Sequence, residues 1–206
     1  MKIKYNNLVI IILINPIDLR EVSVDSLRRE SGFEEVMVDP NGILLVKSPV
    51  AENATIQTTR IEFNTGSDKF LKDKEIVNLV SRVIDCLGKI SIRSVGTNYF
   101  GTLEIEGCKD GGLYIKNKFL RDAKKIESKL GGKIIASATR IFWGTPEKHY
   151  DLRLYPDRLG EVGTVRFQFH IHTANKGDLV SIHDFLVKNV EIEPKIFENK
   201  ITRCLK

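Results

Sequence analysis

The chain has 206 residues, of which 42% are hydrophobic and 29% are charged, with only 15 glycines and 6 prolines. This length and composition exclude a mini-protein, a disordered chain and a fibrous protein, because a chain of this size can bury an ordinary hydrophobic core. Lysine and arginine exceed aspartate and glutamate by only five, so the basic character is modest. No stretch resembles a linker, and we predict a single α+β domain over residues 1–206.

The three cysteines, Cys86, Cys108 and Cys204, are an odd number spread far apart, which favours a reducing compartment over a disulfide framework. We therefore expect a cytoplasmic protein with no membrane association. The apolar run Leu8–Ile14 is too short to span a bilayer, and Asn15–Pro16 after it offers no signal-peptide cleavage site. The run is rich in isoleucine, so it predicts a central strand buried on both faces.

A short helix and a group of strands are expected next. The helix is predicted over Leu19–Glu30. Strands follow over Phe33–Val38 and Ile43–Lys47, joined by a Pro-Asn-Gly turn that is typical of a hairpin. A further strand, rich in threonine and isoleucine, is expected over Thr55–Asn64.

The middle of the chain combines two helix patterns with one strand pattern. Apolar residues at helical spacing predict a helix over Lys74–Leu87. The segment Ile90–Glu106 alternates as a strand, and Gly96 and Gly101 within it indicate a bulge or a close approach of another backbone. A second amphipathic helix is expected over Asn117–Leu130. Its predicted inward side chains are Phe119, Leu120, Ala123, Ile126 and Leu130.

The remaining third of the chain predicts three strands followed by two helices. The expected strands are Lys133–Trp143, Tyr150–Tyr155 and Val162–Thr173, and the expected helices are Asp178–Val190 and Pro194–Leu205. Strands therefore come in runs, with helices between the runs rather than after each strand. This order predicts an α+β fold in which a mostly antiparallel β-sheet packs with amphipathic helices.

Three of the four histidines gather near the last two predicted strands. His170 and His172 alternate with apolar residues, so both project from the polar face of their strand. If the strands pair so that Tyr155 faces Val162, His149 lies on the same face and opposite Gln168. Asp151 would then oppose Arg166, and Glu147 would lie toward His170.

Two interpretations of this histidine cluster stay open. His149, His170 and His172 are candidate metal ligands or acid/base groups, because imidazoles at this spacing bind metals when a third ligand joins them. The simpler interpretation is a solvated polar strand face, which Pro146 supports by disturbing the pairing near Glu147. The sequence holds no nucleophile elbow, phosphate-binding glycine loop or dinucleotide-binding motif. No catalytic residue and no cofactor are therefore predicted.

Positive charge is concentrated between Lys116 and Lys133, where seven basic residues accompany only two acidic ones. The candidate binding residues in this segment are Lys118, Arg121, Lys125 and Lys129. Such a stripe could face the phosphates of a nucleic acid. A solvated helix face is the preferred interpretation, because the segment lacks the aromatic and arginine interleaving of single-strand binders.

Several short segments together resemble a loose group of uncharacterised prokaryotic proteins with a SecB-like fold. The segments are Leu8–Pro16, Val46–Pro49, Leu79–Leu87, Val95–Gly101, Leu152–Pro156 and Val165–His172. The resemblance implies an antiparallel sheet backed by helices, self-association, and binding of other polypeptides rather than catalysis.

We therefore expect a non-enzymatic protein-binding or assembly protein with a chaperone-like character, a polypeptide client or protein partner, and a homo-oligomeric state. Phe100 and Trp143 are the aromatic residues that could line its binding groove. The first alternative is a metal-dependent or acid/base enzyme that uses the three histidines. The second is nucleic-acid binding through the basic helix.

Overall fold

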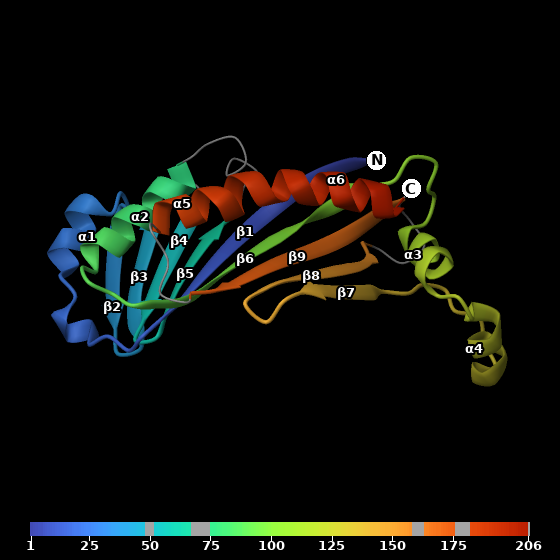
Figure 1. Ribbon diagram of the computed structural model, residues 1–206, viewed down its shortest axis with the longest axis horizontal. Coiled ribbons are helices and arrows are strands. Elements are labelled where there is room, and N and C mark those ends of the chain that lie inside the picture. Colours follow the sequence, from blue (N-terminus) through green and yellow to red (C-terminus); the bar gives the residue numbers. More distant parts are fainter. Residues whose placement is uncertain (48–51, 67–74, 158–162, 176–181, 206) are drawn as a thin grey trace.

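The chain folds around one nine-stranded antiparallel sheet, which the computed structural model in Figure 1 shows in ribbon form. The structure describes residues 1–47, 52–66, 75–157, 163–175 and 182–205. The strand order across the sheet is β2-β3-β4-β5-β1-β6-β9-β8-β7. The strands are β1 (Lys2–Ile14), β2 (Glu35–Asp39), β3 (Gly42–Lys47), β4 (Glu52–Gln57), β5 (Arg60–Thr65), β6 (Ile92–Glu104), β7 (Thr139–Gly144), β8 (Lys148–Pro156) and β9 (Thr164–Ala174).

Helices α1, α2, α5 and α6 lie over one side of this sheet, whereas α3 and α4 lie beyond the end of it (Figure 1). The helical elements are η1 (Leu19–Glu21), α1 (Val24–Glu30), α2 (Glu75–Cys86), α3 (Gly111–Phe119), α4 (Ala123–Leu130), α5 (Ile182–Leu186), the π-helical η3 (Val187–Ile192) and α6 (Glu193–Leu205). The predicted α+β fold with an antiparallel sheet and amphipathic helices is confirmed. Within the described residues, none of these helices is long and apolar enough to cross a membrane.

The core lies between the helices and the sheet face that they cover. In β1, alternate side chains such as Leu8, Ile10 and Ile12 are fully buried there. The intervening Val9 and Ile11 are only half-buried on the opposite face. The central position of this strand is confirmed, but the expected burial on both faces is wrong, because helices cover one face of the sheet.

The turn between β4 and β5 was not expected. The predicted strand Thr55–Asn64 is in fact two strands that form a hairpin, in which Gln57 pairs with Arg60. The turn residues are Thr58 and Thr59. Threonine favours strands, and the turn carries none of the glycine, proline or asparagine residues that normally mark one. The hairpin predicted between β2 and β3 is confirmed, with Asp39 paired to Gly42.

The predicted helix Asn117–Leu130 is wrong, because two separate helices occupy this region. Helix α3 begins earlier, where the Asp110 side chain accepts a hydrogen bond from the Leu113 backbone N–H at 2.9 Å. It ends before Leu120, whose backbone is not helical (φ −103°, ψ 88°). Helix α4 has no buried residue among those described, and Leu130, predicted to face inward, is 71% exposed. The following strand also begins later than expected, at Thr139.

Helices α5, η3 and α6 follow one another without a break, so the expected end at Val190 is wrong. The predicted start of the first of these helices, residues 178–181, lies outside the described residues. In η3, the Glu193 N–H bonds to the Lys188 carbonyl five residues earlier. Pro194 has no N–H to continue this pattern, which would leave the Asn189 carbonyl without its donor. The buried Tyr99 hydroxyl donates to that carbonyl instead.

Glycine in β6 allows its neighbours to approach closely, as predicted. Opposite Gly101, β1 holds an extra residue between Tyr5 and Asn7, which is a β-bulge. A Cβ atom at Gly101 would lie 2.2 Å from the Lys4 carbonyl oxygen. Only glycine fits this position without moving the backbone of β1.

Candidate functional site

An apolar cavity of about 430 Å³ opens between the outer strands β7 and β8 and helix α6. Its floor consists of buried side chains, and its walls are half-buried. The floor residues are Leu152, Phe169, Phe197 and Ile201, and the wall residues are Phe119, Ile141, Trp143 and Tyr150. A volume in this range is typical of a ligand-binding site rather than of a packing defect.

Aromatic rings form most of the cavity surface on the sheet side. Trp143 stacks on its cross-strand partner Tyr150, with ring centroids 5.1 Å apart and ring planes 12° apart. Phe169, on the next strand, lies 6.1 Å from Tyr150 and 4.1 Å from Phe197 of α6. These side chains share the cavity because alternate residues of β7, β8 and β9 point toward the helices.

Charged groups stand at the mouth of the cavity. The buried Glu193 carboxylate accepts a hydrogen bond from the Lys148 ammonium at 2.6 Å. Burial opposes the charge on Lys148, but its bonds to Glu193 and Tyr150 raise its pKa above the ordinary value. Lys200 lies 5.7 Å from the centre of the Tyr150 ring. Lys200 and Arg203 are exposed and form no ion pair with another described residue, so the rim is cationic.

The cavity lies beside the outer edge of the sheet. Strand β7 is the last strand in the sheet order, and none of the described strands pairs with its outer side. Its backbone therefore presents hydrogen-bonding groups next to an aromatic cavity. Such an edge is a site for the addition of another strand.

The two predicted aromatic binding residues lie on opposite faces of the sheet. Trp143 forms part of the cavity wall. Phe100 pairs with Gln168 on the face that the helices leave uncovered, and it is half-buried there. The structure therefore does not bring Phe100 and Trp143 into one groove.

The predicted pairing of β8 with β9 is correct in direction but wrong in register. His149 lies opposite His172, and Asp151 lies opposite His170, a shift of four residues from the expected pairing. A shift by an even number of residues keeps every side chain on its face. The three histidines accordingly share one face, and their ligand atoms lie within 4.8 Å of one another.

The shift in register gives Asp151 different partners from the expected Arg166. Its carboxylate accepts hydrogen bonds from Arg140 at 2.7 and 2.8 Å and from Arg153 at 3.0 and 3.2 Å. Burial disfavours the charged carboxylate, but these two guanidinium groups hold its pKa below the ordinary value. Glu147, expected near His170, instead accepts a hydrogen bond from the Ala174 N–H through its backbone carbonyl.

The four predicted basic binding residues are all exposed, but they do not share one helix. Lys118 belongs to α3, Arg121 lies between the helices, and Lys125 and Lys129 belong to α4. Figure 1 shows α4 extending away from the rest of the molecule. A shallow hollow of about 530 Å³ lies against this region, and Lys116 on its border is paired with Glu127.

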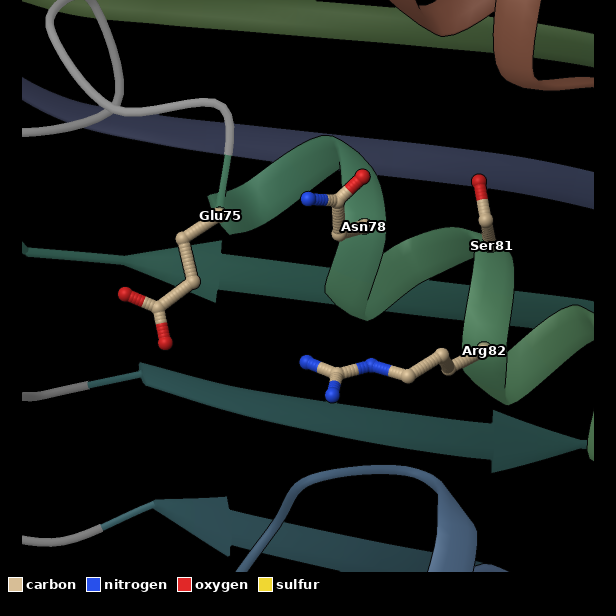
Figure 2. Close-up of a pocket in the computed structure, with 4 residues that line it drawn as sticks. All are labelled: Glu75, Asn78, Ser81 and Arg82. Carbon is tan, nitrogen blue, oxygen red and sulfur yellow. The ribbon is translucent and has the colours of Figure 1, made fainter.

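A further hollow of about 530 Å³ lies over the outward face of α2. Figure 2 shows its four lining residues, Glu75, Asn78, Ser81 and Arg82, projecting from that helix. They are the polar face of an amphipathic helix, and Glu75 is paired with Lys47. We assign no site here, because every lining residue that the structure describes comes from this one helix.

The rim residues Glu193, Lys200 and Arg203 were not predicted from the sequence. They belong to the expected helix Pro194–Leu205 and its flank, but no pattern in the sequence shows which strands this helix crosses.

Comparison with known proteins adds little to this description. No family model matches the chain, and no curated protein matches it. A solved structure titled "Methanococcus jannaschii TBP" is 14% identical, covers 100% of this chain and 98% of its own, and has a TM-score of 0.40. A likeness at that level carries no functional argument. The resemblance to proteins with a SecB-like fold is not tested by these comparisons and stays a prediction.

Proposed function

We propose that this protein is a non-enzymatic polypeptide-binding protein that captures an extended segment along β7. The observation that supports this proposal is the position of the aromatic cavity directly beside an edge strand with no described partner. A peptide added to such an edge gains affinity from its main-chain hydrogen bonds and specificity from pockets for alternate side chains.

The geometry of β7 fits this mode of binding. Ile141 and Trp143 point from β7 into the cavity, so every second residue of an added strand would point to the same side. Tryptophan and tyrosine are enriched among residues that dominate binding energy, and here Trp143 and Tyr150 stack in the wall. On the other side of β7, Phe142 is 60% exposed and offers a second apolar contact.

The charges at the rim favour an acidic segment. Lys200 and Arg203 are cationic and form no ion pair with a described residue, whereas Glu193 is already neutralised by Lys148. A carboxylate in the bound segment would therefore meet positive charge without displacing an existing pair. We assign the segment as extended, with alternating large apolar side chains and at least one acidic residue.

Trp143 is the only tryptophan of the chain, so its fluorescence reports directly on the cavity. The probe is a synthetic heptapeptide in which phenylalanine and valine alternate with threonine, followed by one glutamate. Titration should change the Trp143 emission in a saturable manner. The same peptide with methylated backbone nitrogens should bind at least tenfold more weakly, because it cannot form the strand hydrogen bonds.

Substitutions distinguish peptide binding in the cavity from nonspecific binding to other apolar surface. Trp143→Ala, measured with a fluorescein-labelled peptide, should weaken binding about tenfold or more. Lys200→Glu should weaken binding of the acidic peptide more than binding of the same peptide with glutamine in place of glutamate. Lys195→Glu is the matched control, since Lys195 is an exposed lysine of α6 that does not line the cavity. Equal affinity in the wild type, Trp143→Ala and Lys200→Glu would refute the proposal, as would an absence of binding to the wild type.

The homo-oligomeric state stays a prediction. Pairing through the outer edge of β7 would account for it. Two copies could pair through β7 and occupy the site that the peptide would use. Light scattering after size exclusion, with and without saturating peptide, tests this. Dissociation of a dimer by the peptide would place the interface at β7.

A further inference from the structure

A second candidate site lies on the opposite face of the same strands. His149 from β8 and His172 from β9 are direct cross-strand partners, with ring centroids 4.6 Å apart. His170 lies two residues along β9, and its ring is 6.3 Å from each of the other two. All three side chains are half-buried, and one ring nitrogen from each lies within 4.8 Å of the others. Three imidazoles thus converge on one point of the sheet.

Strand β6 supplies a partner that orients His170. Asn98 lies opposite His170, and the Asn98 Oδ1 atom is 2.9 Å from the His170 Nδ1 atom. When Nδ1–H donates to this amide oxygen, the proton is held on Nδ1, and the Nε2 lone pair remains available. A metal-binding histidine usually donates its other ring N–H to an acceptor of this kind.

The space around the cluster is shaped by its neighbours. Gly96 lies opposite His172, and a Cβ atom there would lie only 3.0 Å from the His170 Cε1 atom. A larger residue would therefore press on the His170 ring. On the other side, the Phe142 ring lies 4.9 Å from the His149 ring and forms an apolar wall.

Burial disfavours the charged forms of His170 and His172. Burial, followed by the charges of His172 and His149, lowers the pKa of His170 below its ordinary value of 6.5. Burial and His149 lower the pKa of His172 in the same direction. Asp151, the cross-strand partner of His170, is held by Arg140 and Arg153, so the donor set is nitrogen only.

We infer that His149, His170 and His172 form a binding site for a divalent transition-metal ion of the zinc, nickel or copper type. Imidazole donors suit these ions, whereas calcium and magnesium prefer oxygen ligands. Zinc bound by nitrogen at about 2.0–2.1 Å requires donor atoms roughly 3.3 Å apart. The three nitrogens, which lie within 4.8 Å of one another, would move closer by rotation of the rings when the ion binds. Three protein ligands on an uncovered sheet face leave the fourth coordination position open to solvent.

This inference does not rest on the peptide-binding proposal, because the two sites use opposite faces of β8 and β9. The test uses full-length protein without a histidine tag, treated with chelator and then dialysed. Zinc is titrated in competition with a chromophoric chelator, and the expected result is one equivalent bound. Cobalt(II) provides a second readout, since a site with three imidazoles gives visible d–d absorption without a thiolate charge-transfer band.

Four substitutions test the ligand assignment. His170→Gln and His172→Gln should each lower zinc affinity by more than Asn98→Leu, which removes the residue that orients His170. Asn98→Leu should lower it about 10–100-fold, the range found for second-layer partners of metal ligands, and Asn98→Asp should restore it by keeping an acceptor oxygen. His183→Gln is the matched control, because His183 lies in α5 and contacts Ser81 instead.

Circular dichroism of the metal-free variants shows whether each one folds. If His170→Gln does not fold, His149→Gln and His172→Gln carry the same test. A wild type that binds no zinc, unchanged zinc affinity in the folded histidine variants, or cobalt spectra dominated by thiolate absorption would each overturn the assignment. Cys204→Ser removes the exposed thiol as a competing ligand.

Discussion

Two regions of the sheet, strands β3–β5 and strands β7–β8, are built from the same alternation of apolar residues, yet only the inward side chains of β3–β5 are fully enclosed. At the β3–β5 end, Ile43, Leu45, Ile56, Ile61 and Phe63 are at most 1% exposed. At the β7–β8 end, Ile141, Trp143 and Tyr150 are half-buried and line a cavity. Both ends point these side chains toward helices. The strand pattern alone therefore does not decide whether an apolar face becomes core or borders a cavity.

The largest expected effect contrasts one large aromatic residue at each end. Phe63→Ala should lower the free energy of unfolding by about 3–5 kcal/mol, because the close-packed surroundings cannot fill the space. Trp143→Ala should cost only about 1–2 kcal/mol, mostly from the lost stack on Tyr150, because its side chain already borders a cavity. Urea denaturation of both variants measures this. Equal losses would mean that the β7–β8 end is as tightly packed as the other.

A second pair of substitutions enlarges a side chain at each end. Ile61→Phe should destabilise the protein by about 1–3 kcal/mol, since Ile61 is fully buried and the larger ring must displace its core neighbours. Ile141→Phe should change stability by less than about 0.5 kcal/mol, because the added atoms enter the cavity. The same variant should block the peptide. Thermal unfolding and the fluorescence titration provide the two readouts, and a strong loss of stability in Ile141→Phe would contradict the described cavity.

The smallest effect concerns the opposite face at the β7–β8 end. His170 and His172 have lowered pKa values in the folded state, so the unfolded chain binds more protons as the pH falls below about 6.5. The metal-free protein should therefore lose stability between pH 7 and pH 5. His149, Asp151 and Arg153 also face this group and modulate it. His170→Gln should flatten the dependence. The measurement is urea unfolding across this pH range in the presence of chelator. A wild-type slope in His170→Gln would contradict a contribution of His170 to the pH dependence of stability.

Local sequence patterns predicted which helices and strands form better than they predicted where each one begins and ends. The helix through Leu79 and Val83 was predictable, because a single stripe of apolar residues defines it. The hairpin turn at Thr58 and Thr59 was not, since its residues favour strands. The break at Leu120 was not predictable, because the amphipathic pattern continues across it, although α3 packs against β8 and β9 and α4 buries none of its described residues.

In the histidine cluster, too, the sequence predicted one feature of the site and missed others. Strand alternation was sufficient to place His149, His170 and His172 on one face, and that prediction is correct. The expected register was four residues away from the observed one, so Glu147 was placed near His170, and the pairing of Asp151 with His170 was missed. Asn98 was missed as well, because it reaches His170 only through the pairing of β6 with β9, 72 residues apart.

The sequence by itself determined the fold class, the alternation of inward and outward side chains in β9, and the face that the histidines share. These properties follow from periodicities of two and 3.6 residues, which are local and can be read along the chain. The tertiary structure alone decided the strand register, the cavity beside β7 and the convergence of the three imidazoles. Those features depend on contacts such as Phe169 with Phe197 and His149 with His172, which join residues far apart in the sequence.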